Sequence, residues 1–530
     1  MDNEGNDMES SRHISKAGIL AAATGGMVGS GWLFGPFLAA QMAGPASVLS
    51  WALGGVLMMV IALTFAELVS TFPSKGSMVR FTHLSHGALT SFTLAWVAWL
   101  ASVMVAPIET SAALQYLGHT WPILVIHQKD SLVLSSVGIG VAAITMLILC
   151  IINCFGANVI SKGNVTIVIW KVAIPLITIL ILLPTHFSWQ PFVAHTGFLP
   201  SGWHGVLAAL PLAGVVFSFI GFSPALQLAG EAKDPARTIP FSIVCAIGMV
   251  IALYIILQIV FVGALPASSY AKGWSHLHFA GDAGPIAGLL AVFGFMWWLK
   301  IIMIDAVVSP IGTGYIYTSS TARMNMAMAD NGYLPNNMTG LNRYRSPWVA
   351  IALNYVLGML CFLPFPGWQS MVGFLVICFV LAYAIGPIAC LTLRYTAPSV
   401  TRRFKVPAVS FTCYCAFTIC NLMIYWTGWA VVYKLLIVTF LGYVFLWLYS
   451  KFFNQINDFS FKQGVWLFPY LLGLGILSYG GDYGGQHWMH FGMDMVIVAA
   501  FSLIIFVSAV LCGVSRGQLS SQAIEAAQSL

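Results

Sequence analysis

The chain has 530 residues, of which 59% are hydrophobic and only 7% are charged. Soluble domains carry about 25% charged residues, so 22 Lys and Arg with 16 Asp and Glu cannot cover the surface of a water-soluble protein of this length. The composition excludes soluble enzymes, nucleic-acid-binding proteins and disordered scaffolds, and it predicts an all-α polytopic membrane protein. The net charge of +6 is attributed to loops that set orientation in the bilayer.

Long stretches of the chain lack Asp, Glu, Lys and Arg altogether, among them 17–66 and 172–230. A membrane-spanning helix needs about 20 apolar residues, so each stretch accommodates one or two spans. We expect about 12 to 14 spans on this basis. The fourteen candidates are residues 17–43, 46–72, 87–116, 131–155, 163–184, 206–229, 240–265, 286–322, 347–364, 369–394, 407–428, 431–451, 464–480 and 493–513.

The loop cations predict the orientation. With the N-terminus inside, the outer loops contain only Lys129, Lys272 and Lys434, and the remaining loop Lys and Arg lie inside. Inner loops retain cations, so the polar tails 1–16 and 514–530 are both expected in the cytoplasm, and the membrane is expected to be the plasma (inner) membrane. The ten cysteines include no CxxC pair, and no disulfide, metal site or cofactor is expected.

The first span contains a sequence that is unfavourable for a helix, Gly25-Gly26-Met27-Val28-Gly29-Ser30-Gly31. Each glycine costs about 1 kcal/mol relative to alanine inside a helix. Close helix packing through the Gly25…Gly29 spacing is one explanation. An unwound stretch is the other, and it fits Gly29-Ser30-Gly31 better because these small residues lie all round the helix. Irregular backbone at membrane depth is tolerated where it lines a cavity, and its free amides and carbonyls suit a zwitterionic solute.

A transporter built from inverted repeats contains a second broken helix five spans later. The sixth span meets this expectation with Phe217-Ser218-Phe219-Ile220-Gly221-Phe222-Ser223-Pro224, in which Gly221 and Pro224 weaken the helix. An ordinary proline kink is the alternative. The position of this sequence favours a second break.

Several motifs together resemble the amino acid–polyamine–organocation (APC) superfamily of permeases, over roughly residues 15–455. The Gly-Ser-Gly-Trp-Leu-Phe sequence at 29–34 and Ser85-His86-Gly87 are most similar to the bacterial aspartate:proton symporters. The other matching motifs are Ala43-Gly44-Pro45, Ala66-Glu67-Leu68, 230–235, 237–240, Arg323, 330–335 and Ser346-Pro347.

The resemblance implies a LeuT-like fold of five plus five inverted helices with additional C-terminal helices. Residues 17–184 would then form the first repeat (spans 1–5), residues 206–394 the second (spans 6–10), and residues 407–513 the additional spans. Glu67 and Glu231 lie near inner ends of spans, and we expect them to anchor loops.

The resemblance also implies a substrate site at the two breaks. The amides around Gly29, Ser30 and Gly31 would bind an α-carboxylate, and nearby carbonyls would bind the α-ammonium. The expected substrate-binding residues are Met27, Gly29, Ser30, Gly31, Phe217, Ile220 and Phe222.

The aromatic residues of this set, Phe217 and Phe222, would act as a lid, with core packing as the alternative. Ser223 stands where some family exchangers carry a glutamate gate, which argues against a cationic substrate. Tyr317 is a second candidate gate.

Ionisable residues inside apolar spans are functional candidates by default because charge is costly there. Lys171 lies within span five, and in sodium-independent family members a lysine on this helix replaces the sodium ion. A proton carrier and a static lysine bonded to helix-end carbonyls are the alternatives. In span eight, Asp305, Ser309 and Thr313 recur every four residues and so share one face.

We expect Ser309 or Thr313 to face Lys171, and Asp305 to pair with Lys300 or Lys171. Glu109 in span three is either a proton site or a polar packing link. The expected coupling residues are Lys171, Ser309, Thr313, Asp305 and Glu109.

An enzyme, a transporter-like sensor and a secondary transporter are the three function classes open to such a membrane protein. An enzyme requires clustered catalytic groups, and the sequence contains no HExxH or paired-carboxylate motif. A transporter-like sensor is disfavoured by the short tails, and no nucleotide-binding loop indicates an ATP-driven pump. We therefore predict a secondary transporter that takes up an amino acid such as aspartate or glutamate with protons. A neutral amino acid permease or an exchanger is the alternative. The expected partners are the amino acid, protons and the lipid bilayer, without nucleic acid.

Overall fold

The computed structural model describes residues 14–73, 77–128, 131–155, 157–193, 197–278, 284–365, 367–453 and 460–515. Most of the predicted N-terminal tail (1–13) and C-terminal tail (516–530), and the predicted loop cations Arg12, Lys75, Lys129 and Arg516, lie outside these residues.

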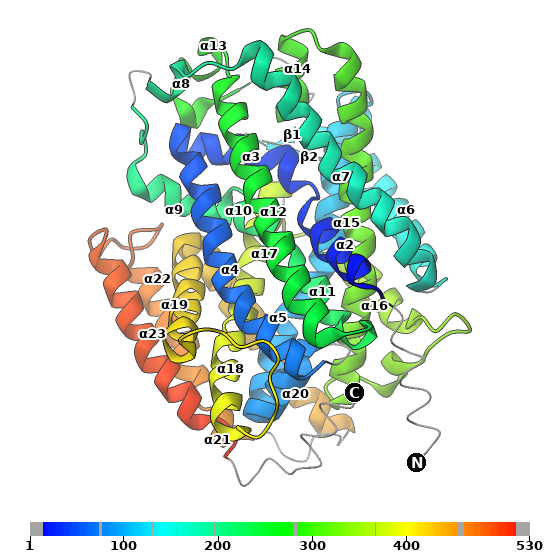
Figure 1. Ribbon diagram of the computed structural model, residues 1–530, viewed down its shortest axis with the longest axis vertical. Helices are drawn as coiled ribbons and strands as arrows, with labels where there is room; N and C mark the ends of the chain where they lie inside the picture. The colour runs from blue at the N-terminus through cyan, green and yellow to red at the C-terminus, as the bar shows by residue number, and fades with distance from the viewer. Residues whose placement is uncertain are drawn as a thin grey trace.

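Figure 1 shows a bundle of helices that run mainly along the long axis of the molecule. The helices of the first half are α2 (Lys16–Met27), α3 (Gly31–Ala43), α4 (Ser47–Thr71), α5 (Ser77–Leu117), α6 (Ser136–Asn153), α7 (Ala157–His186) and α8 (Gln190–Val193). The middle part contains α9 (Gly202–Leu212), α10 (Val215–Phe219), α11 (Ser223–Gln227), α12 (Pro235–Gly263), α13 (Ala267–Tyr270), α14 (Pro285–Val292) and α15 (Met296–Asp330). The remainder is α16 (Trp348–Leu360), α17 (Trp368–Tyr383), α18 (Ile385–Thr396), α19 (Val409–Thr427), α20 (Trp429–Phe453), α21 (Phe461–Gly464), α22 (Leu467–Gly480) and α23 (Met493–Cys512).

The described residues contain ten helices that are long and apolar enough to cross a membrane, or eleven if the bent pair 202–212 and 215–227 is one span. This is fewer than the fourteen expected. The difference arises because residues 31–71 form one apolar helical run, and because α16 and α22 are only 13 and 14 residues long. The chain is an all-α polytopic membrane protein.

Three expected spans begin at different residues. The span expected at 286–322 begins as a long helix only at Met296, after the separate short helix α14. The span expected at 131–155 begins as a helix only at Ser136, because 131–134 form strand β2 (Ser131–Leu134), which pairs antiparallel with β1 (Val125–Gln128). The span expected at 87–116 begins ten residues earlier, at Ser77, and it contains a break at Gly87, whose φ is 69°. A Cβ at Gly87 would lie 2.4 Å from Cβ of Ser460, so this joint of the Ser85-His86-Gly87 motif requires glycine.

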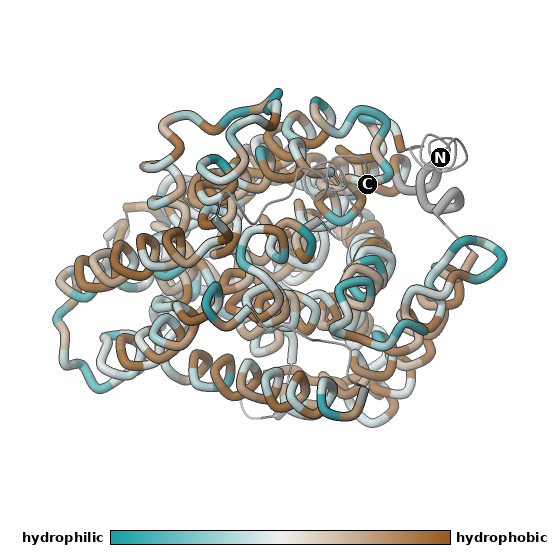
Figure 2. Tube along the Cα trace, turned by 90° about the horizontal axis from the view of Figure 1, so that it is seen from below, coloured by the Kyte–Doolittle hydropathy of each residue, from teal (hydrophilic) through white to brown (hydrophobic). Residues whose placement is uncertain are grey.

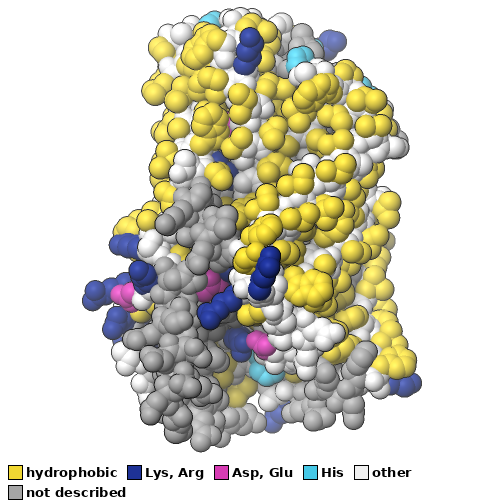
Figure 3. Space-filling model, turned by 90° about the vertical axis from the view of Figure 1, so that its right-hand side faces the viewer, with side chains coloured by type: hydrophobic (Ala, Val, Ile, Leu, Met, Phe, Trp, Pro, Cys, Tyr) yellow, Lys and Arg dark blue, Asp and Glu magenta, His cyan; other side chains and the backbone are white. Residues whose placement is uncertain are grey.

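Hydrophobic side chains cover much of the outer surface. Figure 3 shows them over most of one face, with most of the visible Lys, Arg, Asp and Glu in the lower half and a few Lys or Arg at the upper end. Viewed from that end in Figure 2, hydrophobic residues follow the helices at the rim, and hydrophilic residues are more frequent where helices connect. This distribution is that of a protein whose sides contact lipid, because soluble proteins seldom expose such large apolar areas.

The interior is formed by helices from distant parts of the sequence, since α5 packs along α15 and α17, and α4 packs along α12. At one end, Ile14 pairs with the segment after α11: its amide donates to the Glu231 carbonyl (2.9 Å), and its carbonyl accepts from the Lys233 amide (3.0 Å). Arg323 on α15 forms an ion pair with the Glu231 side chain at 2.6 Å. The expectation that Glu231 anchors a loop is confirmed.

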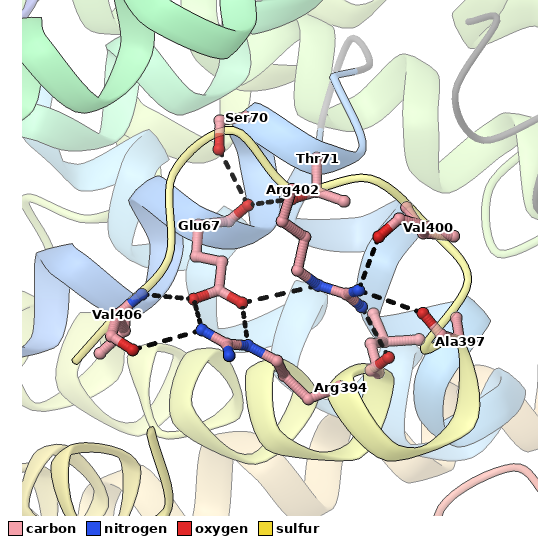
Figure 4. A network of polar contacts seen from close by, with 9 residues as sticks. Glu67, Ser70, Thr71, Arg394, Ala397, Val400, Arg402 and Val406 are labelled. Atoms are coloured by element: carbon pink, nitrogen blue, oxygen red, sulfur yellow. Dashed lines mark hydrogen bonds and ion pairs between the residues drawn. The ribbon is translucent and has the colours of Figure 1, made fainter. Parts of the chain in front are cut away.

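Glu67, near the end of α4, is the centre of a polar network (Figure 4). Its carboxylate accepts hydrogen bonds from Arg394 Nε (2.5 Å), from Arg394 Nη2 (2.7 Å) and from the amide of Val406 (2.7 Å), and Arg402 lies 3.6 Å away. Arg402 in turn donates to the carbonyls of Leu393, Ala397 and Val400. Glu67 therefore fixes the loop after α18 to α4, as expected for an anchoring residue.

Candidate functional site: the two broken helices

The first break separates α2, which ends at Met27, from α3, which begins at Gly31. Val28 has non-helical dihedral angles (φ −95°, ψ 85°). The interruption predicted from the glycine-rich sequence is confirmed, and all of 25–31 is buried.

The second broken span is interrupted at the expected place and once more before it. A bend of 49° separates α9 from the α10–α11 segment, and Gly214 between them adopts φ 83°, a left-handed conformation that favours glycine. At the expected place, a short 3-10 turn over 220–222, which contains Gly221, separates α10 from α11. A Cβ at Gly221 would be 2.1 Å from the Met27 nitrogen. Gly221 therefore permits close contact between the two broken segments.

Backbone carbonyls at the two breaks accept hydrogen bonds from tyrosine hydroxyls. Tyr254 on α12 donates to the Met27 carbonyl at 3.2 Å. Both Tyr317 on α15 and Tyr383 on α17 donate to the Ile220 carbonyl at 3.3 Å. Tyr254 and Tyr383 were not among the predicted residues, because with 13% aromatic residues the sequence does not distinguish them from core tyrosines.

The amide of Ser30, predicted to bind a carboxylate, donates a hydrogen bond of 2.8 Å to Glu109 Oε2 on α5. Glu109 is 1% exposed, and its other oxygen, Oε1, has no hydrogen-bond partner among the described residues. That oxygen lies only 2.5 Å from where a Cβ on Gly29 would be. A carboxylate of the protein itself therefore lies against the amides of the first break.

Lys171 on α7 is fully buried and reaches the same break from the other direction. Its ammonium donates to the carbonyl of Gly25, the free end of α2, at 2.7 Å, and to Thr313 Oγ1 at 2.6 Å. Of the two hydroxyls considered, Thr313 faces Lys171, while Ser309 Oγ donates to Asp305 Oδ1 at 2.6 Å.

Asp305 is also fully buried, but it does not form the expected ion pair. Its carboxylate accepts hydrogen bonds from Ser309, from Trp170 Nε1 (2.8 Å) and from Trp32 Nε1 (3.1 Å). Among the described residues no ion pair joins Asp305 to a lysine, and Lys300 is exposed near the start of α15. The pairing prediction is wrong because two indole N–H groups and a hydroxyl satisfy this carboxylate.

The two predicted lid residues contact different aromatic side chains. Phe217 stands edge-on to Trp368 with ring centroids 5.9 Å apart. The ring centroid of Phe222 lies 5.2 Å from that of Tyr383 and 6.3 Å from that of Phe65. Ser223, the first candidate gate, is buried as the first residue of α11.

Trp368, the first residue of α17, was missed by the sequence reasoning. Its indole N–H donates to Ser30 Oγ at 2.8 Å, and its ring stacks on Phe34 at 4.9 Å. Phe34 in turn meets Tyr116 edge-on at 5.3 Å. The only local signal in the sequence was the Pro366-Gly367 dipeptide before Trp368, which indicates the start of a helix and not its contact with a residue 338 positions away.

These features define a membrane protein with two adjacent broken helices, buried charges and backbone groups at the breaks. The chain belongs to the amino acid permease family, whose profile matches residues 17–446, and it is an amino acid transporter.

Among its relatives, the glutamate/serine transporter AimA of Bacillus subtilis is 35% identical over 514 residues, which cover 95% of this chain and 94% of the relative. The aspartate-proton symporter of the same organism is 31% identical over 528 residues (98% and 99%). The branched-chain amino acid permease BcaP is 25% identical over 467 residues (84% and 95%).

Proposed function

We propose that the protein takes up an acidic amino acid, such as glutamate or aspartate, together with protons across the plasma membrane, with both termini in the cytoplasm. The amides of 29–31 bind the substrate α-carboxylate, and the carbonyls of Met27, Phe217 and Ile220 bind its α-ammonium. Residues 17–184 and 206–394 form the two repeats that move against each other, and 407–513 are additional spans. The names of two relatives reported above support this substrate class, since one names glutamate together with serine and the other names aspartate and protons.

The observation that carries the proposal is the contact between Glu109 and the Ser30 amide. A buried carboxylate with one oxygen that lacks a hydrogen bond destabilises the folded protein. Here the Glu109 carboxylate accepts the hydrogen bond of the Ser30 amide, to which the substrate carboxylate would bind. When Glu109 is ionised it holds the amide itself. When a proton binds Glu109, the amide becomes available to the substrate, so substrate and proton are carried together.

Charge balance supports the same sequence of events. The described core around the breaks contains one cation, Lys171, and two carboxyl groups, Glu109 and Asp305. Asp305 is stabilised by three donors, whereas Glu109 has one. Because the Glu109 carboxylate has fewer hydrogen-bond donors than Asp305, protonation stabilises Glu109 more than it stabilises Asp305. Lys171 holds the end of α2 against α15.

The arrangement also favours one alternative, uptake of a neutral amino acid. Lys171 is the only cation among the described residues at the breaks, and its ammonium already donates to Gly25 and Thr313. A second substrate carboxylate would therefore rely on neutral donors such as the tyrosine hydroxyls. If the protein takes up serine and does not prefer acidic over neutral amino acids, this alternative is indicated.

Uptake into proteoliposomes tests the proposal. Labelled glutamate, aspartate, serine and alanine are supplied with and without an inward proton gradient, and the wild type is expected to accumulate the acidic amino acids only with the gradient. Glu109→Gln mimics the protonated side chain, so it should still exchange substrate across the membrane but lose gradient-driven accumulation. Asp494→Asn, a buried acid in α23 outside the site, is the matched control. Gradient-driven accumulation by Glu109→Gln at the wild-type level would refute the role of Glu109.

A further inference from the structure

A cavity of about 760 Å³ opens at the end of the bundle that carries α13, α14 and the β1–β2 hairpin, opposite the Glu67 network. Helices α3, α5, α17 and α20, the hairpin and the segment after α13 all contribute to its walls. Small-molecule sites commonly have volumes of about 300–1,000 Å³, so this vestibule is large enough for an amino acid. Its polar lining residues include Gln41, Gln115, His127, His278, Gln369 and Lys434.

The described lining of the vestibule contains one Lys or Arg, Lys434, and no Asp or Glu. His127 and His278 also line it. Lys434 is half-buried, and no ion pair joins it to an acidic side chain in the described part of the chain. Its ammonium lies 5.8 Å from the ring of Phe365, also on the wall. A concave surface with a cation and low-dielectric walls attracts anions and raises their local concentration.

The aromatic residues at the floor of the vestibule also cover the first break. Phe34, Tyr116 and Trp368 all line the vestibule, and Phe34 stacks on Trp368 and meets Tyr116 edge-on. On the opposite side of this floor, Trp368 donates its hydrogen bond to Ser30. A solute in the vestibule is therefore separated from the break by one layer of aromatic side chains.

We propose that the vestibule is a first binding site for the acidic amino acid, in which Lys434 attracts a substrate carboxylate before the aromatic floor opens. This inference rests on the proposed function, because it needs a negatively charged substrate. A neutral amino acid, with no net charge, gains almost nothing from Lys434. The vestibule then determines selectivity at the entry step and leaves the chemistry at the breaks unchanged.

Transport kinetics provide the first test. Lys434→Gln should raise the KM for glutamate about threefold or more at low ionic strength, because one charge at a distance of several Å is worth a few-fold in local concentration even in water. Its kcat, and the KM for serine, should stay at the wild-type values. Salt of about 0.5 M should remove the difference, since screening lengths are then only a few Å. Lys434→Arg should restore the wild-type KM.

The matched control is Lys272→Gln, which removes an equal charge from an exposed lysine of the same end that does not line the vestibule. If the wild type takes up glutamate normally and Lys434→Gln has the same KM as the wild type or as Lys272→Gln, the vestibule inference is overturned and the proposed function stands. A wild type that accumulates no acidic amino acid contradicts the proposed function instead.

Chemical labelling tests occupancy without transport. Gln369→Cys places a thiol on the exposed vestibule wall, and it is combined with Gly29→Leu, whose side chain would collide with Glu109 and Thr313 and block the lower site. Glutamate should slow modification of this thiol more than serine does, and Lys434→Gln should abolish the difference. Equal rates with both amino acids would overturn the vestibule as a site for acidic substrates.

Discussion

The electrostatic coupling between Glu109 and Lys171 can be measured with a double-mutant cycle. The structure bounds the distance between Lys171 Nζ and Glu109 Oε1. Thr313 Oγ1 lies 2.6 Å from the ammonium, and Oγ1 and Oε1 lie 2.7 and 2.5 Å from the Cβ position of Gly29. The two charged atoms are therefore less than about 8 Å apart, although no ion pair within 4.0 Å joins them among the described residues.

At an effective dielectric constant of about 20, charges about 4 to 8 Å apart attract by about 4 to 2 kcal/mol. Lys171→Met and Glu109→Gln keep the approximate volume of each side chain and remove its charge. Each single variant loses the attraction, and the double variant loses it only once. The coupling energy for unfolding should therefore be about 2 to 4 kcal/mol.

The free energy of unfolding is measured in mixed micelles for the wild type, both single variants and the double variant. The coupling should decrease at lower pH, because a proton on Glu109 removes the attraction. In the control cycle Asp494→Asn replaces Glu109→Gln, and its effects should add with those of Lys171→Met. Additive effects of Glu109→Gln and Lys171→Met, within about 0.5 kcal/mol, would refute the proximity of the two charges and with it the charge-balance argument for coupling.

The remaining predictions concern packing and hydrogen bonding around the site. Gly221→Ala should abolish uptake and lower the melting temperature, because its Cβ would be 2.1 Å from backbone; Gly248→Ala, with nothing within 4 Å of its Cβ, should keep uptake and gain up to about 1 kcal/mol in stability. Glu67→Gln should lower the free energy of unfolding by about 3 to 5 kcal/mol, since it leaves buried guanidinium charge without its partner. Asp330→Asn, at an exposed ion pair, should lower it by less than about 1 kcal/mol. Equal losses of stability in thermal unfolding would contradict this ranking. Trp32→Phe should cost about 1.5 to 3 kcal/mol by removing one donor to a buried carboxylate, and an unchanged unfolding free energy would show that this indole does not stabilise the acid.

The sequence predicted the break in the first helix because its cause is local. Four glycines in seven residues lower helix stability whatever surrounds them. The sequence also predicted the interruption at 220–222, but it did not single out the bend at Gly214, because a lone glycine gives the same local signal at both positions. Only packing shows that Gly221 contacts the backbone of Gly26 and Met27 while Gly214 adopts the left-handed conformation.

The pairing of the buried polar groups likewise followed no sequence rule. The four-residue spacing in span eight correctly placed Asp305, Ser309 and Thr313 on one face. It did not show that Ser309 and two tryptophans satisfy Asp305, or that Thr313 alone meets Lys171. Except for Ser309, which lies on the same helix as Asp305, these partners lie more than 100 positions apart in the chain, so their contact depends on how the helices pack.

The amino-acid sequence by itself determined the membrane environment and the presence of broken helices, because the cost of charge in lipid and of glycine in a helix are properties of short segments. The tertiary structure alone decided that Glu109 lies against the Ser30 amide, and that Trp368 closes the space between the first break and the vestibule. A buried carboxylate takes whichever donor the packing brings within hydrogen-bond distance, and no single segment of sequence specifies that donor.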